Sequence, residues 1–326
     1  MAGLWVIAET NGDGSLARSS AELGTLGRTL GTAASIDVTG VVVAVDPGPA
    51  AAELATYVGR VIAIPEPLAS DHAWGQIAAQ RAAEVIDASG RTLVLTGAGP
   101  DGRDVAGTLL ALLDGAVLVN ATAVAWADGE SVEMSVFGGK LITTSGFTAG
   151  AGVRIVTVRP NAVTAEPAKS AGTVERRSPA GPLGLPAVKI VDRLAESGAA
   201  VSIDDARIIV AGGRGVAGAA GFALVQEIAD LLGGAVGATR AAVDSGWIPY
   251  AQQIGQTGKI VKPRLYLAMG ISGAIQHKVG MQTSETIIAV NRDPDAPIAE
   301  FADLLVVGDL FEVGRALVTK LRERGE

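Results

Sequence analysis

Short runs of apolar residues recur along the first third of the chain, with alanine-rich helical stretches between them. The runs are continuous rather than alternating, and they cover residues 4–8, 41–45, 60–64 and 92–96. Continuous apolar strands separated by helices are typical of a parallel sheet that is covered on both faces. This part of the chain is therefore predicted to form a doubly wound α/β domain.

The pattern changes after Asp114, where strand-like stretches follow one another without helices between them. These stretches cover residues 116–124, 132–137, 140–144 and 153–158. Neighbouring strands joined by short connections usually pair in antiparallel fashion. We expect them to extend the first sheet as antiparallel additions.

Residues 160–197 show little periodicity and are rich in proline, glycine, alanine and charge, which predicts a loop or linker with room for one strand near 188–191. A second α/β series follows, with expected strands at 207–211, 235–239, 265–269, 286–290 and 304–307. In its first expected helix, 219–232, Phe222, Val225, Ala229 and Leu232 share one face. We predict two doubly wound α/β domains, 1–199 including the linker and 200–326, because a chain of 326 residues is longer than a single hydrophobic core usually accommodates.

The amino-acid composition limits which partners and which kinds of chemistry the protein can have. The chain is 48% hydrophobic, but no apolar run approaches the roughly 18 residues of a membrane span, and no basic leader precedes the first strand, so we expect a cytoplasmic protein without membrane insertion. A net charge of -8 disfavours nucleic acid as a partner. With no cysteine and two histidines, thiolate metal sites, iron–sulfur clusters and histidine-rich metal sites are excluded. Any redox chemistry must then rely on an organic cofactor.

A glycine-rich turn follows the first strand of the second series. Gly213, Gly215 and Gly218 fit the spacing G-x-G-x-x-G, which lets the backbone approach a phosphate. Because the chain has 43 glycines, chance matches are common, and a simple tight turn is the alternative. The next strand ends in Thr239-Arg240 rather than in an acid, which disfavours NAD. Arg240 is compatible with the 2′-phosphate of NADP or with a flavin ring.

Three further polar features lie in the second series. Residues 252–258 form a polar loop too hydrophilic for a core, and Ser272 is expected to cap a helix whose first N–H groups face a second phosphate. His277 on that helix is either structural or a ligand contact. Asn291 and Asp309 stand at strand carboxyl ends, where they serve either as turn formers or as ligand contacts.

Together these motifs resemble the FAD domain of electron-transfer flavoprotein alpha subunits. The resemblance runs from 212 to 313 and includes Gly-Gly-Arg-Gly at 212–215, Ala-Thr-Arg-Ala-Ala-Val-Asp-Ser-Gly-Trp at 238–247, Gly-Gln-Thr-Gly at 255–258, Gly-Ile-Ser-Gly-Ala-Ile-Gln-His at 270–277, Asn-Arg-Asp-Pro at 291–294 and Gly-Asp-Leu-Phe at 308–311. A looser likeness to the first domain of the family covers 95–97 and 156–161. The family implies a Rossmann-like FAD-binding domain at the C-terminal end and a first domain that serves as scaffold and subunit contact.

The resemblance also implies which residues bind FAD. The phosphate region would be contacted by Arg214 and Gly215, and the flavin would lie at Thr239 and Arg240. The isoalloxazine would be lined by Ile254, Gly255, Gln256 and Thr257, with the Thr257 hydroxyl near N5. The pyrophosphate and ribityl part would be bound by Ser272, Gly273, Ala274, Ile275, Gln276 and His277, with His277 at the pyrimidine end, and the AMP half would be held by Asn291, Asp309 and Leu310. One position departs from the family, because Thr239 stands where serine is common. The hydroxyl group is kept.

In function, the resemblance implies an electron carrier without substrate turnover of its own. Such a protein forms a heterodimer with a beta subunit that usually carries AMP, accepts electrons from dehydrogenases such as the acyl-CoA dehydrogenases of fatty acid beta-oxidation, and passes them to a membrane quinone oxidoreductase. Arg240, His277 and Thr257 would tune the flavin, since a positive charge and an N–H donor stabilise the negative charge that one electron adds to its N1–C2=O edge.

Two other interpretations remain open from the residues alone. One is an NADP- or thiamine-diphosphate-dependent enzyme with a related nucleotide domain, and the other is a binding module that keeps a nucleotide only as a structural element. In the first domain, the glycine loop 96–104 is either a second nucleotide site or a strand-to-helix turn capped by Asp101, and it lacks the Gly-Lys-Ser/Thr ending of a P-loop.

Overall fold

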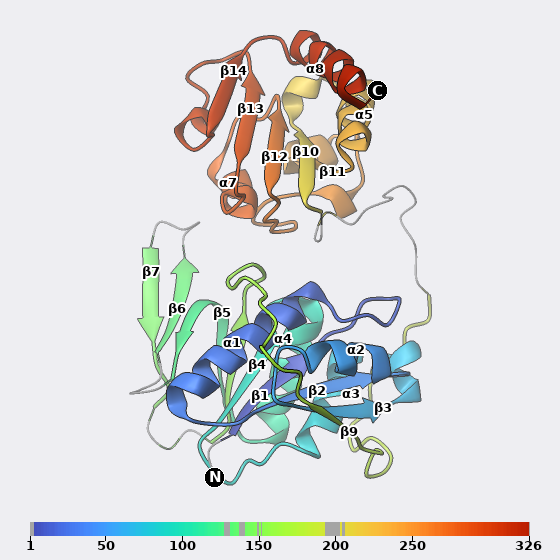
Figure 1. Cartoon of the computed structure of the whole chain (residues 1–326), viewed down its shortest axis with the longest axis vertical. Coiled ribbons are helices and arrows are strands. Elements are labelled where there is room, and N and C mark those ends of the chain that lie inside the picture. Colours follow the sequence, from blue (N-terminus) through green and yellow to red (C-terminus); the bar gives the residue numbers. More distant parts are fainter. Residues whose placement is uncertain are drawn as a thin grey trace. The chain divides into compact units, whose positions relative to one another are not determined.

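The computed structural model describes residues 3–126, 131–136, 141–148, 150, 152–192, 203 and 206–325. The chain divides into two compact units, Met1–Arg193 and Leu194–Glu326. Each unit is an α/β layer structure, as predicted, and each is described by itself (Figure 1). No helix in the described ranges is both long and apolar enough to cross a bilayer.

The first unit contains one large mixed sheet with helices on both faces. Its elements are β1 (Gly3–Ala8), α1 (Arg18–Ala34), β2 (Val38–Ala44), α2 (Gly48–Leu54), β3 (Arg60–Pro65), the 3₁₀ turn η1 (Pro67–Ser70), α3 (Trp74–Ala83), β4 (Thr92–Gly97), α4 (Pro100–Leu112), β5 (Ala116–Ala125), β6 (Ser131–Val136), β7 (Leu141–Ser145), β8 (Arg154–Val158) and β9 (Thr173–Arg176). The strand order is β7-β6-β5-β8-β4-β1-β2-β3-β9.

The expectation of four antiparallel additions is only half right. Strands β5 and β6 pair in antiparallel fashion, as do β6 and β7, but β8 lies between β4 and β5 and is parallel to both. Because β6 is antiparallel to both of its neighbours, β7 already runs in the direction of β5, and β8 keeps that direction instead of reversing it a third time. Its side chains are largely buried while those of β7 are partly or fully exposed, which suits a central and an edge strand respectively.

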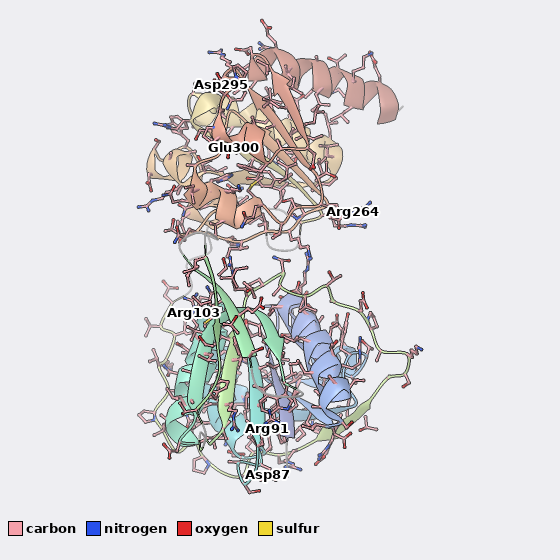
Figure 2. The ribbon with its side chains drawn as sticks, turned by 90° about the vertical axis from the view of Figure 1, so that its left-hand side faces the viewer. Asp87, Arg91, Arg103, Arg264, Asp295 and Glu300 are labelled. Carbon is pink, nitrogen blue, oxygen red and sulfur yellow. The ribbon has the colours of Figure 1, made fainter. Side chains whose placement is uncertain are left out.

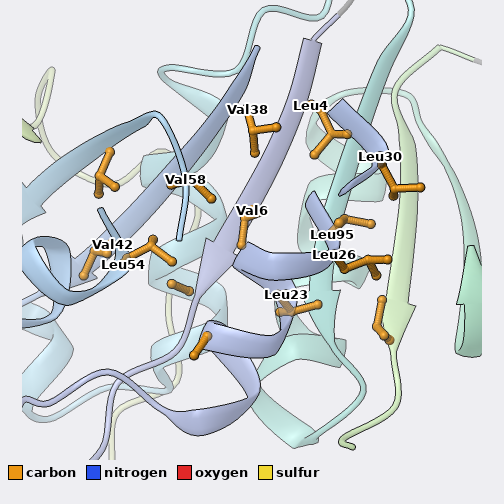
Figure 3. Close-up of a cluster of buried hydrophobic side chains, with 14 of the residues drawn as sticks. Leu4, Val6, Leu23, Leu26, Leu30, Val38, Val42, Leu54, Val58 and Leu95 are labelled. Atoms are coloured by element: carbon orange, nitrogen blue, oxygen red, sulfur yellow. The ribbon is translucent and has the colours of Figure 1, made fainter. Parts of the chain in front are cut away.

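Two apolar clusters cover the two faces of this sheet. Val6 of β1 belongs to the cluster under α1 and α2, while Ile7 belongs to the cluster under α3 and α4. Figure 3 shows the first cluster, in which Leu23, Leu26 and Leu30 of α1 meet the strand residues. Because successive strand side chains point to opposite faces, burial on both faces explains the continuous apolar runs.

The segment predicted as a linker forms a strand at a different place from the one expected. Strand β9 pairs in parallel with β3, whereas Lys189 makes only an isolated bridge with His72. Polar side chains of α3 then hold the following backbone: Gln80 accepts from Leu185 N at 2.7 Å and donates to its carbonyl at 3.2 Å, and Gln76 accepts from Val188 N at 3.0 Å. The described part of this segment is thus attached to the first unit, while 193–197 lie outside the described residues.

The second unit is a parallel sheet in the order β11-β10-β12-β13-β14. Its elements are β10 (Ile208–Gly212), η3 (Arg214–Val216), η4 (Ala219–Gly221), α5 (Phe222–Leu232), β11 (Ala235–Ala238), α6 (Arg240–Asp244), η5 (Tyr250–Gln252), β12 (Leu265–Met269), α7 (Ile275–Met281), β13 (Ile287–Asn291), η6 (Pro297–Glu300), β14 (Leu304–Val307) and α8 (Leu310–Gly325). Residues of α5 and α8 share one apolar cluster, and residues of α7 and η6 share the cluster on the other face.

The strand order of the second unit defines where a ligand can enter. From β10 the chain passes first to β11 on one side and then to β12 on the other side. The loops that leave β10 and β12 therefore diverge, and a crevice opens at the carboxyl ends of these two strands. Figure 2 shows the two ends of this sheet, with Arg264 just before β12 and Asp295 at the opposite end, after β13.

Candidate functional site

A cavity of about 650 Å³ lies in the second unit at this switch point. Its wall comes from the segments that follow β10, β11, β12 and β13 and from the loop after η5. The lining residues are Gly213, Arg214, Gly215, Thr239, Arg240, Ala241, Asp244, Ile254, Gly255, Gln256, Thr257, Gly270, Ile271, Ser272, Ala274, Gln276, His277, Asn291, Asp293, Ala296 and Pro297. Its volume is in the range of small-molecule and cofactor sites.

The glycine turn after β10 packs directly against the turn after β12. A Cβ on Gly213 would lie 2.4 Å from the carbonyl oxygen of Gly270, and a Cβ on Gly215 would lie 2.7 Å from the Cα of Gly270. The amides of Gly213 and Gly215 donate to the carbonyls of Met269 and Gly270, both at 3.0 Å. These glycines therefore serve the close approach of two turns, and the Arg214 side chain is the charged group that the turn adds to the wall.

Thr239 and Arg240 begin the short helix α6. Thr239 is its N-cap in backbone geometry, but its side chain makes no capping bond, and its Oγ1 is buried without a hydrogen-bond partner. Arg240 Nε lies 3.2 Å from Asp244 Oδ2, and both side chains are largely exposed. Asp244 was missed by sequence reasoning, although its i,i+4 spacing from Arg240 would have indicated the pair.

The polar loop 252–258, which its composition marked as too hydrophilic for a core, contains two buried glutamines. Gln252 and Gln253 are buried, with Gln253 only 2% exposed, and Gln253 Nε2 donates to Thr257 Oγ1 at 3.0 Å. Gly255 has φ 142° and stands so close to α7 that a Cβ would lie 2.8 Å from the carbonyl of Gln276. The buried Gln253 amide ties the loop to Thr257, and the loop presents Gln256 and Thr257 to the cavity.

His277 is buried at the cavity wall and has both ring nitrogens engaged. Nε2 lies 2.9 Å from the Tyr266 hydroxyl oxygen, and Nδ1 lies 3.0 Å from the carbonyl oxygen of Ile254. Burial lowers the pKa of His277 to about 4, against the smaller opposing effect of the Ile254 carbonyl. The ring is therefore neutral at neutral pH, and its contacts differ from the free N–H donor that the resemblance implied.

Ser272 does not cap the helix as expected. Helix α7 begins at Ile275 with Ala274 in the N-cap position, and Ser272 lies in the turn before it, where its carbonyl accepts from Ile298 N at 3.0 Å. Gly273, with φ 85°, has no room for a Cβ because the backbone nitrogen of Ile298 would be 2.4 Å away. The approach of η6 thus shapes this turn, and Ser272 still lines the cavity.

Four expected contact residues do not line the cavity: Gly273, Ile275, Asp309 and Leu310. Asp309 caps α8, with its Oδ1 accepting from Phe311 N at 2.8 Å and Glu312 N at 3.1 Å, and it pairs with Arg292, which holds the pKa of its carboxyl below the usual range. Asn291 does line the cavity, and its amide donates to the carbonyl of Ile271 at 2.9 Å.

Several wall residues were not singled out as site residues from the sequence. They are Ala241, Asp244, Gly270, Ile271, Asp293, Ala296 and Pro297. Most stand within a few residues of a recognised motif, so proximity to Arg240, Ser272 and Asn291 was the available signal. Ala296 and Pro297 join the wall through the loop between β13 and η6, which only the tertiary contacts reveal.

The wall fits the FAD that the resemblance implies. It combines an unpartnered buried hydroxyl at Thr239, two arginines and tight glycine turns that admit no side chain. A buried polar atom without a partner is uncommon in proteins and is explained if a ligand atom completes its bond. Among the described residues no group of three or more His, Cys, Asp or Glu side chains could hold a metal ion.

Comparison with known proteins assigns both units to one family. Residues 4–181 match the model of the electron transfer flavoprotein domain, and residues 202–282 match that of the electron transfer flavoprotein FAD-binding domain. The chain is 42% identical to the electron transfer flavoprotein subunit alpha of Mycobacterium leprae over 96% of both chains. Its identity to the same subunit of Mycobacterium tuberculosis strain H37Rv is 42% over 99% of both.

A shorter match has a higher identity. The chain is 53% identical to the subunit alpha of Thermoanaerobacterium thermosaccharolyticum over 41% of each chain. None of these similarities supports the alternative of an NADP- or thiamine-diphosphate-dependent enzyme.

Proposed function

This chain belongs to the electron transfer flavoprotein alpha-subunit family and carries electrons on FAD, and we propose that it takes them from dehydrogenases without turning over a substrate of its own. The proposed FAD site is the cavity of the second unit. Residues 200–326 would form the FAD-binding domain, and residues 1–199 would form the scaffold for subunit contact.

The name of the relatives, subunit alpha, supports a heterodimer with a beta subunit. We propose that this beta subunit carries AMP, that acyl-CoA or related dehydrogenases donate the electrons, and that a membrane quinone oxidoreductase accepts them. The complex would work in the cytoplasm.

The observation that carries the proposal is the chemistry of the cavity wall. The Thr239 hydroxyl is buried and unpartnered, and Arg214 and Arg240 line the same cavity at the carboxyl ends of β10 and β11. Two cationic side chains favour an anionic ligand with phosphate groups. A dinucleotide across a switch point is the ligand that this sheet topology commonly binds.

Each group has a defined task in this proposal. When bound, FAD supplies the centre that accepts and releases single electrons. The Arg240 guanidinium offsets negative charge on the reduced ring. Since Thr257 Oγ1 accepts a bond from Gln253, its own O–H proton is free to point into the cavity, toward a ring nitrogen.

The proposal is tested first by co-expressing the chain with its beta subunit and recording a visible spectrum during stepwise anaerobic reduction. We expect flavin bands that bleach in two resolved one-electron steps. A colourless complex that takes up no added FAD would refute the proposed function. Binding of FAD without any accessible reduction would instead support a structural nucleotide.

Removing the positive charge of Arg240 should make the bound flavin harder to reduce. We expect Arg240→Ala to lower the first midpoint potential by some tens of millivolts, on the order of 1 kcal/mol, because the exposed guanidinium acts through solvent and is partly offset by Asp244. Arg240→Lys, which keeps the charge, should move it less. Spectroelectrochemical titration measures both, and an unchanged potential in Arg240→Ala would contradict the assigned role.

Replacing Thr239 with valine should have opposite effects on the empty and the loaded protein. An unpartnered buried hydroxyl destabilises the chain, so Thr239→Val is expected to raise the free energy of unfolding of the FAD-free protein by about 1 kcal/mol. FAD affinity should fall by roughly tenfold because the ligand loses a hydrogen bond. Thr239→Ser keeps the hydroxyl and is the control. Urea unfolding and FAD titration test the two parts, and unchanged affinity in the valine variant would exclude a ligand contact.

A further inference from the structure

Tyr266 is buried in β12, where its hydroxyl group needs a partner inside the protein. Its side chain is 0% exposed, and burial raises the pKa of the phenol well above its usual value, so the O–H group stays protonated. The hydroxyl oxygen lies 2.9 Å from His277 Nε2. Tyr266 does not line the cavity, whereas His277 does.

The second ring nitrogen of His277 identifies its tautomer. Nδ1 lies 3.0 Å from the carbonyl oxygen of Ile254, and a carbonyl oxygen can only accept. Nδ1 therefore carries the proton and donates it. In the neutral ring Nε2 is then an acceptor, and the Tyr266 O–H group donates to it. The low pKa of His277 agrees with a ring that stays neutral at neutral pH.

The bond to Ile254 connects this pair to the segment 254–257, which lines the cavity. Ile254 N donates to the carbonyl of Ala238 at 2.9 Å, and Gln256 N donates to that of Gln276 at 2.7 Å. A Cβ on Gly280 would lie 2.3 Å from the amide nitrogen of Gly255, so this segment and α7 are in close contact. The segment 254–257 is thus held from β11, from α7 and from the imidazole.

We propose that Tyr266 is a positioning residue that holds His277 as the neutral Nδ1–H tautomer and thereby fixes the cavity wall at 254–257. The consequence for FAD rests on the proposed function, while the tautomer and the wall geometry do not. In this arrangement His277 contributes neither a positive charge nor a free N–H group to the cavity. The positive charge comes from Arg214 and Arg240, and Gln256 and Thr257 owe their placement in part to a hydroxyl that never touches the ligand.

The test uses nitrogen-15 histidine labelling of the full chain, with and without FAD. The chain contains only His72 and His277, so two sets of ring signals are expected. At pH 7 wild-type His277 should be protonated on Nδ1 and unprotonated on Nε2. A signal pattern with the proton on Nε2, or on both nitrogens, would overturn the proposal whether or not FAD is bound.

Tyr266→Phe then removes the donor. We expect the His277 Nε2 signal to move away from its hydrogen-bonded position and the FAD dissociation constant to rise roughly three- to tenfold. Tyr250→Phe is the matched control, because the Tyr250 hydroxyl donates to the Thr257 carbonyl at 2.7 Å, in the same segment but without a histidine between. It should leave the His277 signals in place. Unchanged His277 signals and unchanged affinity in Tyr266→Phe would overturn the positioning role.

Fluorotyrosine labelling covers the case in which Tyr266→Phe does not fold. The chain has three tyrosines, and ring fluorination keeps the side chain while making the O–H group a stronger donor. The Nε2 signal of His277 should then shift, and a signal that does not respond would exclude the hydrogen bond. If no form of the chain binds FAD, the proposed function fails, but these signals still decide the inference about Tyr266.

Discussion

Gly215→Ala is expected to weaken FAD binding by roughly ten- to hundredfold, the range that corresponds to about 1 to 3 kcal/mol of overpacking strain. A methyl group at this position would lie 2.7 Å from the Cα and 2.9 Å from the carbonyl oxygen of Gly270. Both atoms are backbone, so no side chain can turn aside, and the two turns that bear Arg214 and Ser272 must separate. The bond from Gly215 N to the Gly270 carbonyl would be lost as well.

Gly308→Ala provides the matched control in the same unit. A Cβ there would meet only Val313 Cγ2 at 3.4 Å, an ordinary van der Waals contact. Titration of FAD into the stripped protein, followed by fluorescence, measures the affinity of both variants, and thermal unfolding shows how much of the loss is global. If Gly215→Ala retained affinity within about twofold of wild type, FAD binding would not depend on the close contact between these two turns, contrary to the expectation.

Glu9→Gln should remove a large pH dependence of stability from the first unit. Glu9 follows β1, and burial raises the pKa of its carboxyl from 4.5 to about 7, with the negative charge of Asp101 adding to the effect. Its Oε1 is buried without a partner and close to the backbone of Gly97 and Gly102, where added Cβ atoms would lie 2.4 and 2.9 Å away. Ser20 holds the Glu9 backbone through its hydroxyl, at 2.7 Å from the amide and 3.0 Å from the carbonyl.

The raised pKa of Glu9 determines in which direction stability changes with pH. The folded protein binds this proton more tightly than the unfolded chain, so the contribution is fully present below pH 4.5 and is lost as the pH rises through about 7. Between pH 5 and pH 8 the free energy of unfolding of wild type should fall by up to about 3 kcal/mol relative to Glu9→Gln. Urea unfolding across this range measures the difference.

Glu133→Gln on β6 is the control for the loss of one negative charge, because Glu133 is exposed. Parallel stability curves for wild type and Glu9→Gln would show that the Glu9 carboxyl titrates normally, contrary to the expectation. Curves that separate between about pH 4.5 and 7 and run parallel above that range would agree with it.

The sequence alone determined most of the secondary structure and the position of the site along the chain. Strands β12 and β14 have the predicted bounds, and β10, β11 and β13 differ by one residue or so, because a buried strand is recognised from its own apolar run. The expected helix 219–232 begins later, since η4 precedes α5. Arg214, Thr239 and Arg240 lie in one cavity because their motifs follow strands of one parallel sheet, and Thr257 joins them from the loop after η5.

Only the tertiary structure decided the strand order and the partners of polar groups. The position of β8 between β4 and β5, the burial of Gln253 and the engagement of His277 by Tyr266 and Ile254 all depend on residues that meet through space. The local pattern of apolar and polar residues predicts which face of a strand or helix is buried. It does not predict which distant atom will form a hydrogen bond with a hydroxyl, an amide or an imidazole, because that partner comes close only when the whole sheet assembles.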